Sequence, residues 1–518
     1  MGTGLARERH RARPGGEKEV GGGGGGAGGR KKDGGGGGGD EDVPSPERGR
    51  HEFRGVGPGG EPILGHRDGK PIRVDVGGKT LTKVFQYCKK HAYSDGYDVS
   101  AWDAKFIAKF IGDPGLETLY DLILASNELK IEGLLALTCQ TLGNKIKGKS
   151  PHEICDILNI RGVFTPQLHE EHSSGSCASH TALAAMGIIA NWWNLELKLV
   201  DKALQALHIV RCQEFTGYEP KINGLVRHRF NDFNLAFFDL DKETSFSRGP
   251  PLNNKTPTRE SVVRSCVNVV SLKVRESDVG FPVDIFGTVV ARDSVDYRCV
   301  YLFRRERDDP QHISSPDDML SLTDPCRGLV PGSSVYFEID LKIKCDGCAD
   351  KDFSKGMVEF DSVHLCEGKV TMTLGLGSWL SWVELLCAQV YWPVEATIEI
   401  NVLKGPCNIS KVAASTPGNF KDHIILYEAA GGPTVIGDGG SVPLNRRVVA
   451  VTREQKLALF IVGGDALEHL ALTLGHSQEM VNRRMGCAEV EVKVAWTAVP
   501  IRKRSNMIKV VANQRLLL

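Results

Sequence analysis

Nearly half of the chain, from about residue 261 to residue 497, is a succession of strand-like segments without helix-length segments between them. The segments VEATIEINV (394–402) and AEVEVKVAW (488–496) alternate apolar and polar residues, which predicts one buried and one solvated face. Parallel strands need long crossover connections, usually helices. Because such connections are missing, this region is predicted to form antiparallel sheets in a sandwich or barrel.

Seven further segments of this region are rich in β-branched residues and are separated by Gly, Pro and Asp turn signals. They are Val267–Val274, Val283–Ala291, Tyr297–Phe303, Ser334–Ile343, His423–Ala429, Arg446–Val451 and Lys456–Val462. Before them, the aromatic residues Phe230, Phe233, Phe237 and Phe238 are expected to pack onto the β-rich domain.

A second informative stretch, Leu116–Pro166, predicts three helices. Apolar residues recur at helical spacing from Leu116 to Ser126 and from Ile131 to Lys147. Gly148 follows as a C-cap, and SPHE at 150–153 is a capping box that starts a short third helix. The apolar faces exceed what the helices need for packing on one another. This excess predicts a surface that receives helices of another protein, although an ordinary helical domain has the same periodicity.

Several motifs in this part of the chain resemble the S-phase-kinase-associated (SKP-type) adaptor of SCF-type cullin–RING ubiquitin ligases. They are KVFQYCKKHA (83–92), WDAKFI (102–107), LYDLILASNELKIEGLLALTCQT (119–141), IKGKSPHEI (146–154) and NIRGVFTP (159–166). The resemblance covers about Pro71–Glu171. It implies a mostly helical BTB/POZ-like segment, here truncated, with a remnant of the family's first strands at Ile72–Val76. The overall fold class is then α+β multidomain.

The resemblance implies a non-catalytic bridge that binds F-box proteins and a cullin for ubiquitin-dependent protein degradation. Cullin docking falls on Asn127 and Glu128; the family usually has an aromatic residue after the Asn, and an acidic residue is unfavourable there. The family's F-box-binding groove corresponds to Leu134, Thr138, Cys139, Leu142, Ile146, Ile154, Leu158, Ile160 and Phe164.

The β-rich part, about Phe230–Trp496, is similar to an uncharacterised domain abundant in monocot plant proteins. That resemblance implies a fold and a plant origin but no activity. Two alternatives therefore stay open. In one, the β-rich domain is the working part of a non-ligase interaction protein and the adaptor segment is degenerate. In the other, an enzyme using loop carboxylates lies within the β-rich domain, although no nucleophile motif, HExxH or phosphate loop supports it.

Charge and cysteine usage exclude several classes of function. The 64 basic and 64 acidic residues balance, which argues against nucleic acid and anionic membranes as partners. No apolar run reaches membrane-spanning length, and the 14 scattered cysteines suit reduced, buried thiols. We expect a protein of the nucleus and cytoplasm. The single CxxC, at 345–348, fits a hairpin turn better than zinc, so no metal, cofactor or small-molecule substrate is predicted.

Composition divides the chain into five predicted regions. A Gly-rich tail at 1–60 is expected to be disordered, because nothing apolar offsets the entropy of ordering glycine. The adaptor-like segment follows at 61–172, a helix with a connector at 173–260, the β-rich domain at 261–498 and a basic tail at 499–518.

Overall fold

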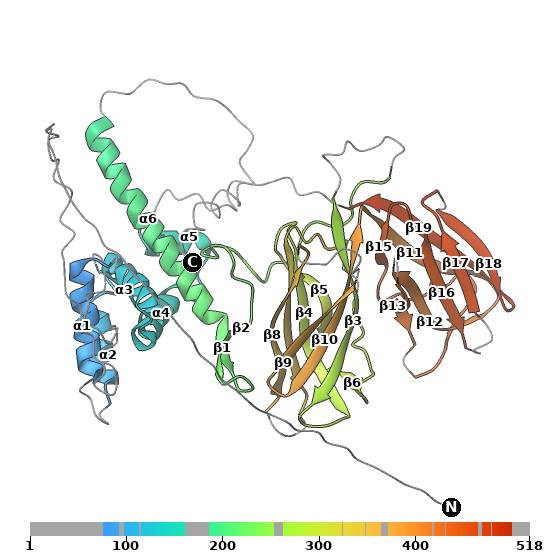
Figure 1. The fold of residues 1–518 in the computed structure, drawn as a ribbon, viewed down its shortest axis with the longest axis horizontal. Coiled ribbons are helices and arrows are strands. Elements are labelled where there is room, and N and C mark those ends of the chain that lie inside the picture. Colours follow the sequence, from blue (N-terminus) through green and yellow to red (C-terminus); the bar gives the residue numbers. More distant parts are fainter. Residues whose placement is uncertain are drawn as a thin grey trace, which may run out of the picture. The chain divides into compact units, whose positions relative to one another are not determined.

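The computed structural model describes the helical region, the connector and the β-rich region (Figure 1). The described residues are 76–92, 98–112, 115–160, 186–252, 263–323, 325–345, 347, 349–363, 371–416, 419–429, 431–464, 469–477 and 479–499. The Gly-rich tail, the basic tail, Phe164 and residues 72–75 of the expected strand remnant lie outside this set. No helix among the described residues is long and apolar enough to cross a membrane.

The three helices predicted between residues 116 and 158 are confirmed. Gly148 has φ +72°, as a glycine just past a helix end often has. The capping box is present: the Glu153 N–H donates to Ser150 Oγ at 3.3 Å, and the Ser150 N–H donates to Glu153 Oε2 at 2.8 Å. The helices are α1 (Gly78–Ala92), α2 (Ser100–Ala108), α3 (Leu116–Glu128), α4 (Glu132–Ile146), α5 (Pro151–Ile157) and α6 (Met186–Glu214).

The connector after α6 begins with a hairpin of β1 (Thr216–Glu219) and β2 (Gly224–Arg227) and continues as the aromatic run. Phe230 is only 1% exposed, and its ring lies 5.1 Å from that of Tyr297 and 4.6 Å from that of Tyr336. Its backbone N–H donates to Glu338 at 2.8 Å. Phe230, Phe233 and Phe238 therefore pack onto the β-rich region, as the sequence predicts. For Phe237 the prediction is wrong, because this side chain packs against the core of the helical region.

The first half of the β-rich region is a sandwich of two antiparallel sheets around one apolar core. One sheet has the order β3-β10-β9, and the other has the order β5-β4-β7-β8 with β6 also paired to β4. The strands are β3 (Ser265–Ser277), β4 (Val283–Arg292), β5 (Val300–Arg305), β6 (Gln311–Ile313), β7 (Ser334–Ile343), β8 (Lys351–Asp361), β9 (Thr371–Ser378) and β10 (Ser381–Tyr391).

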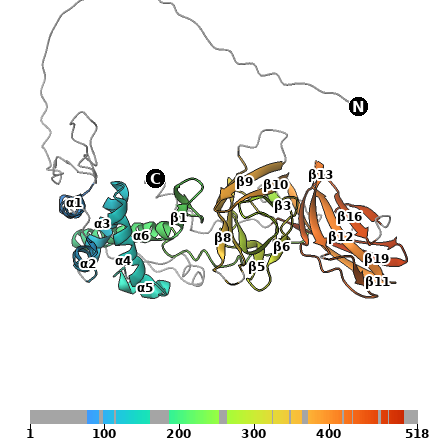
Figure 2. The same cartoon turned by 90° about the horizontal axis from the view of Figure 1, so that it is seen from below.

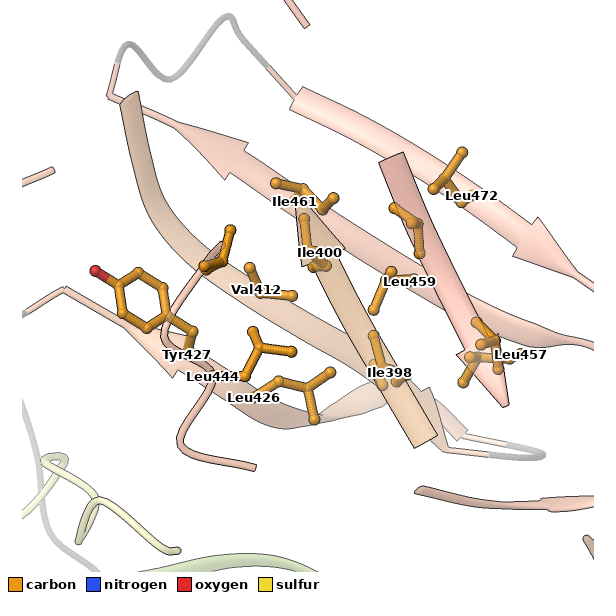
Figure 3. Packing of buried hydrophobic residues seen from close by; sticks show 14 of the residues in the cluster. Ile398, Ile400, Val412, Leu426, Tyr427, Leu444, Leu457, Leu459, Ile461 and Leu472 are labelled. Atoms are coloured by element: carbon orange, nitrogen blue, oxygen red, sulfur yellow. The ribbon is translucent and has the colours of Figure 1, made fainter. Parts of the chain in front are cut away.

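The second half is another sandwich, with sheets β15-β11-β19-β18 and β13-β12-β16-β17, and β14 paired to β12. Figure 3 shows side chains of β11 meeting those of β12, β13, β16 and β17 between the sheets. The strands are β11 (Pro393–Lys404), β12 (Cys407–Thr416), β13 (Asn419–Glu428), β14 (Thr434–Ile436), β15 (Val448–Thr452), β16 (Leu457–Gly463), β17 (His469–Leu474), β18 (Met480–Met485) and β19 (Ala488–Ala498).

The two sandwiches repeat one topology, which the sequence analysis does not predict. Strands β3 to β10 correspond in order to β11 to β14 and β16 to β19, with the same pairings in both copies. In the first copy β6 pairs with residues 283–285 of β4, and β5 pairs from Gly287 onward. In the second copy β14 pairs with residues 407–409 of β12, and β13 pairs from Lys411 onward. All these sheets are open, so the sandwich prediction holds and the barrel alternative is wrong.

Strand β15 corresponds in the first copy only to an isolated bridge between Leu329 and Val267 of β3, and it contributes to the joint between the copies. Asn268 of β3 donates to the Ala450 carbonyl at 2.8 Å and accepts from the Ala450 N–H at 3.0 Å. Cys266, Val390 and Ala450 share a small buried cluster with Val499. The extra strand thus satisfies its backbone groups partly through a side chain of the other sandwich.

Candidate partner-binding surface of the helical region

The residues predicted to bind an F-box lie on α4 and around α5, and the described ones are buried. Eight are at most 4% exposed, and seven of them belong to one apolar core shared with α1, α2, α3 and α6, while Thr138 is a buried polar residue. The eight are Leu134, Thr138, Cys139, Leu142, Ile146, Ile154, Leu158 and Ile160. Helices α3 and α4 need this packing because short helices are marginal alone in water.

Local hydrogen bonds hold these residues in place. The Thr138 hydroxyl donates to the Leu134 carbonyl of its own helix at 2.8 Å, so it needs no partner protein to be satisfied. The Tyr120 hydroxyl donates to the Leu158 carbonyl at 3.2 Å, which links α3 to the end of α5. The side chains between α3, α4 and α5 therefore form a packed core beneath the surface and do not line an open groove.

Helix α6 covers one side of α4. A Cβ added to Gly143 would lie 3.6 Å from Val210 Cγ1 and 3.8 Å from Glu214 Oε1. Burial, together with the nearby Cys212 and Glu214, raises the pKa of Cys139 to about 12. Lys202 of α6 also reaches α3, where its Nζ lies 2.9 Å from an oxygen of Asp121 and 3.2 Å from one of Glu117.

The opposite flank of α4 carries half-buried apolar side chains. Leu137 is two residues from Cys139, which places it about 200° around the helix from the side that faces α6. Leu137, Cys155 and Ile157 pack against the helical interior while remaining partly exposed. The F-box-binding residues that the resemblance implies do not include these three side chains. The signal was present, because Leu137 stands beside the Leu134–Thr138 stripe at helical spacing.

The residues expected to bind a cullin lie at the end of α3. Asn127 is half-buried, and Glu128 is exposed and is the last residue of the helix. Lys130 follows in the left-handed region with φ +55°, and it is exposed as well. This end of α3 thus presents a charged surface, and the structure shows no apolar anchor at position 128.

No group of three or more metal-ligating side chains occurs in the part of the chain that the structure describes. Of the CxxC segment, Cys345 and Gly347 are described, whereas Asp346 and Cys348 are not.

Comparisons with known proteins agree with the division of the chain. The "Skp1 family, dimerisation domain" matches residues 132–172, and the "Domain of unknown function (DUF6598)" matches residues 266–494, which include both sandwiches. SKP1-like protein 11 of Arabidopsis thaliana is 44% identical over 108 residues, covering 20% of this chain and 67% of that protein. SKP1-like protein 1 of Oryza sativa subsp. japonica is 40% identical over 119 residues, covering 19% and 66%.

The chain thus spans about two thirds of the length of these relatives. Among solved structures, human GIVD cytosolic phospholipase A2 with a bound fluorophosphonate is 9% identical, covers 46% of this chain and 32% of that one, and has a TM-score of 0.16. That likeness is too weak to inform the fold or function.

The fold defines a class: a segment of packed helices followed by a duplicated β-sandwich module. Within that class, the helical segment shows the family, because its relatives match it over about two thirds of their own length at about 40% identity. The chain belongs to the SKP1-like family and carries an additional DUF6598 region.

Proposed function

We propose that the chain is an adaptor of an SCF-type ubiquitin ligase that binds F-box proteins and bridges them to a cullin. Membership of the SKP1-like family supports this role for the helical segment. The reacting groups belong to other subunits, and the adaptor contributes by holding a substrate close to them. The bridge would act in the nucleus and cytoplasm.

The single observation that carries the proposal is the partly exposed flank of α4 and α5. Leu137, Cys155 and Ile157 offer apolar surface to a partner helix, and the predicted F-box-binding residues support that surface from beneath. Helix-in-groove recognition relies on such aliphatic contacts on a prepared support. Because α6 lies on the other side of α4, an F-box can dock on this flank without displacing α6.

The structure decides which substitution tests the proposal. Leu142 is fully buried, so Leu142→Lys would unfold the helical region and would report nothing about binding. Leu137→Lys and Ile157→Lys place a charge on the exposed flank instead. We expect each to abolish binding of a purified F-box domain in a calorimetric titration, with the circular dichroism of the protein unchanged.

A matched control lies on the α6 side. Lys202→Ala removes two ion pairs that are away from the proposed flank, and F-box affinity should stay as in the parent protein. If Lys202→Ala changes the affinity while Leu137→Lys does not, the F-box binds on the α6 side and the assignment of the flank is wrong.

Cullin docking has a separate test at Glu128. An acidic side chain that leaves water for an apolar interface is unfavourable, so the parent protein is expected to bind a cullin N-terminal domain weakly. Glu128→Tyr should strengthen this binding, and Glu132→Tyr, an exposed position one turn away on α4, should not. Equal behaviour of the two variants would place the cullin contact elsewhere.

A further inference from the structure

The connector and the first sandwich enclose a cavity of about 640 Å³ that the adaptor role does not use. The end of α6 and the β1–β2 hairpin supply one set of lining residues, and β4, β7 and β8 supply another. Trp379, in the turn between β9 and β10, completes the lining. Small-molecule sites in proteins have volumes of this order.

Three polar atoms of the lining residues are buried without a hydrogen-bond partner among the described residues. They are His228 Nε2, Asp340 Oδ1 and Trp379 Nε1. Buried polar atoms in native proteins are nearly always bonded, so three such atoms at one cavity call for a ligand or solvent that bonds them. The Trp379 N–H is a donor and the Asp340 oxygen is an acceptor, and the His228 nitrogen needs a partner as well. A ligand that bonds all three must therefore both donate and accept hydrogen bonds.

The side chains are held in position by neighbouring groups. A Cβ at residue 217 would lie 2.4 Å from His228 Cε1, so only a glycine there leaves room for the imidazole. The Trp379 backbone N–H donates to Glu219 Oε1 at 2.7 Å, which ties the turn to the hairpin. Trp379 itself has φ +49°, an uncommon conformation for a bulky residue. These contacts fix the positions of His228 and Trp379 beside the cavity.

The charges around the cavity restrict the ligand. The cations of the lining already have acidic partners: Lys355 lies near Asp352, with 3.9 Å between Nζ and Oδ2. Arg229 already contacts Asp241 at 2.9 Å and Glu338 at 3.3 Å. Burial lowers the pKa of His228, and Lys355 lowers it further, so the ring is neutral near pH 7. Because both cations of the lining are already paired with carboxylates, a phosphate or carboxylate ligand gains little from them, and the remaining carboxylates repel it.

We infer that this cavity binds an uncharged polyhydroxylated molecule, namely a short oligosaccharide. Each hydroxyl both donates and accepts, so neighbouring hydroxyls satisfy the Trp379 donor and the Asp340 acceptor together. The aromatic residues Tyr218, Tyr301 and Trp379 add apolar surface to the lining, as sugar rings require.

The test is a calorimetric titration of the full chain with four neutral trisaccharides: maltotriose, cellotriose, xylotriose and chitotriose. We expect at least one to bind at millimolar concentration or below. Trp379→Phe keeps an aromatic ring and removes the donor, and Asp340→Asn removes the charge; each should weaken binding about tenfold. Trp382→Phe, an exposed tryptophan outside the cavity, should bind like the parent protein.

Four results would overturn the inference. One is that none of the four trisaccharides binds. Another is that Trp379→Phe and Asp340→Asn, shown by near-ultraviolet circular dichroism to be folded, bind as tightly as the parent. A third is that glucose 6-phosphate binds more tightly than every neutral sugar, which would make this an anion site. The last is that tetra-alanine binds more tightly than every sugar, which would make it a peptide site.

Discussion

The two sandwiches share their strand order but differ in how they use charge. In the first copy Arg292 is fully buried and pairs with Glu338, with 2.6 Å between Nε and Oε1 and 2.8 Å between the second guanidinium nitrogen and Oε2. In the second copy the strand that corresponds to β7 is β16, which reads LALFIVG and has no charged residue. The same topology therefore carries an ion pair between β4 and β7 in one copy and only uncharged residues on the strand that corresponds to β7 in the other.

The difference follows from what each copy has to hold. Glu338 accepts from the Phe230 N–H and from Arg229, and Arg292 donates to the Leu240 carbonyl at 2.8 Å. These contacts fasten the connector to the first sandwich. The second copy meets the connector through backbone hydrogen bonds, in which the Leu252 N–H donates to the Trp496 carbonyl at 3.1 Å and the Ala498 N–H donates to the Pro250 carbonyl at 2.9 Å. Its two sheets pack through mostly aliphatic side chains, with Tyr427 among them (Figure 3). Buried charge in this molecule accompanies attachment rather than the sandwich fold as such.

The largest expected effect is at the buried ion pair. Arg292→Met leaves the Glu338 carboxylate buried without its main partner, which should lower the free energy of unfolding by about 3–5 kcal/mol. Guanidinium denaturation followed by tryptophan fluorescence measures it. The double change Arg292→Met with Glu338→Leu leaves no unpaired charge and should lower stability much less. If the single and double variants are equally stable, the pair has no special role in the first copy.

The next effect is a pH dependence at the joint between the copies. Glu395 of β11 is fully buried, and it accepts from the Gly328 N–H at 2.7 Å. Burial raises the pKa of Glu395 to about 7. The folded state therefore holds this proton more firmly than the unfolded state, so the contribution to stability is complete below about pH 4.5 and is lost as the pH rises through 7.

The loss amounts to about 3 kcal/mol between these limits. Glu395→Gln should remove that part of the pH dependence, which denaturant unfolding at pH 5 and pH 8 would show as a smaller difference than in the parent protein. Glu399→Gln, an exposed carboxylate on the same strand, serves as the control. A Glu395→Gln profile parallel to that of the parent would contradict the buried, proton-binding role.

A smaller effect is expected where β15 meets the first copy. Asn268→Ala leaves the Ala450 N–H and carbonyl without their side-chain partner, which should cost about 1–3 kcal/mol. Hydrogen exchange of the Ala450 amide should also become faster, because its protection depends on this bond. Asn408→Ala, at an exposed position of β12, should leave both quantities unchanged. Unaltered exchange at Ala450 in Asn268→Ala would show that the joint rests on apolar packing alone.

The smallest expected effect is at a surface ion pair that the second copy has and the first copy lacks at the corresponding position. Lys411 pairs with Glu428 at 3.0 Å where β13 begins to pair with β12, whereas the first copy has Gly287 opposite Arg305 there. Both side chains of the pair are well exposed, so Lys411→Ala should cost only about 0.2–1 kcal/mol. The cost should vanish in 1 M salt, where screening is nearly complete. A larger loss that persists in salt would indicate packing by the lysine stem.

Sequence patterns predicted the strands that alternate or are rich in β-branched residues, and they predicted the capped helices. They missed β10, SWVELLCAQVY, because a mostly apolar run without strict alternation does not distinguish a strand from a buried helix. They missed the duplication because the copies preserve topology while exchanging residues such as Glu338 for the aliphatic side chains of β16. Strand pairing is decided by long-range contacts that leave little mark on local composition.

The helical region shows a different limit. The predicted F-box-binding residues were selected from a resemblance, and that resemblance does not report which side chains α6 and the neighbouring helices bury. Leu137 and Ile157 remained outside the prediction because their partial exposure depends on where α6 packs. Helical spacing predicts a stripe, whereas only the tertiary structure shows which edge of the stripe reaches solvent.

The duplication has a consequence for synthesis on the ribosome. In each copy the first strand pairs with the last, as β3 does with β10 and β11 with β19, so neither sheet is complete until its final strand has emerged. Neighbouring domains of the same topology can exchange equivalent strands and become trapped in misassembled forms. Placing β7 in the second copy would leave the buried Arg292 without Glu338, at a high energetic cost. The ion pair therefore favours the assembly in which β7 pairs within its own sandwich.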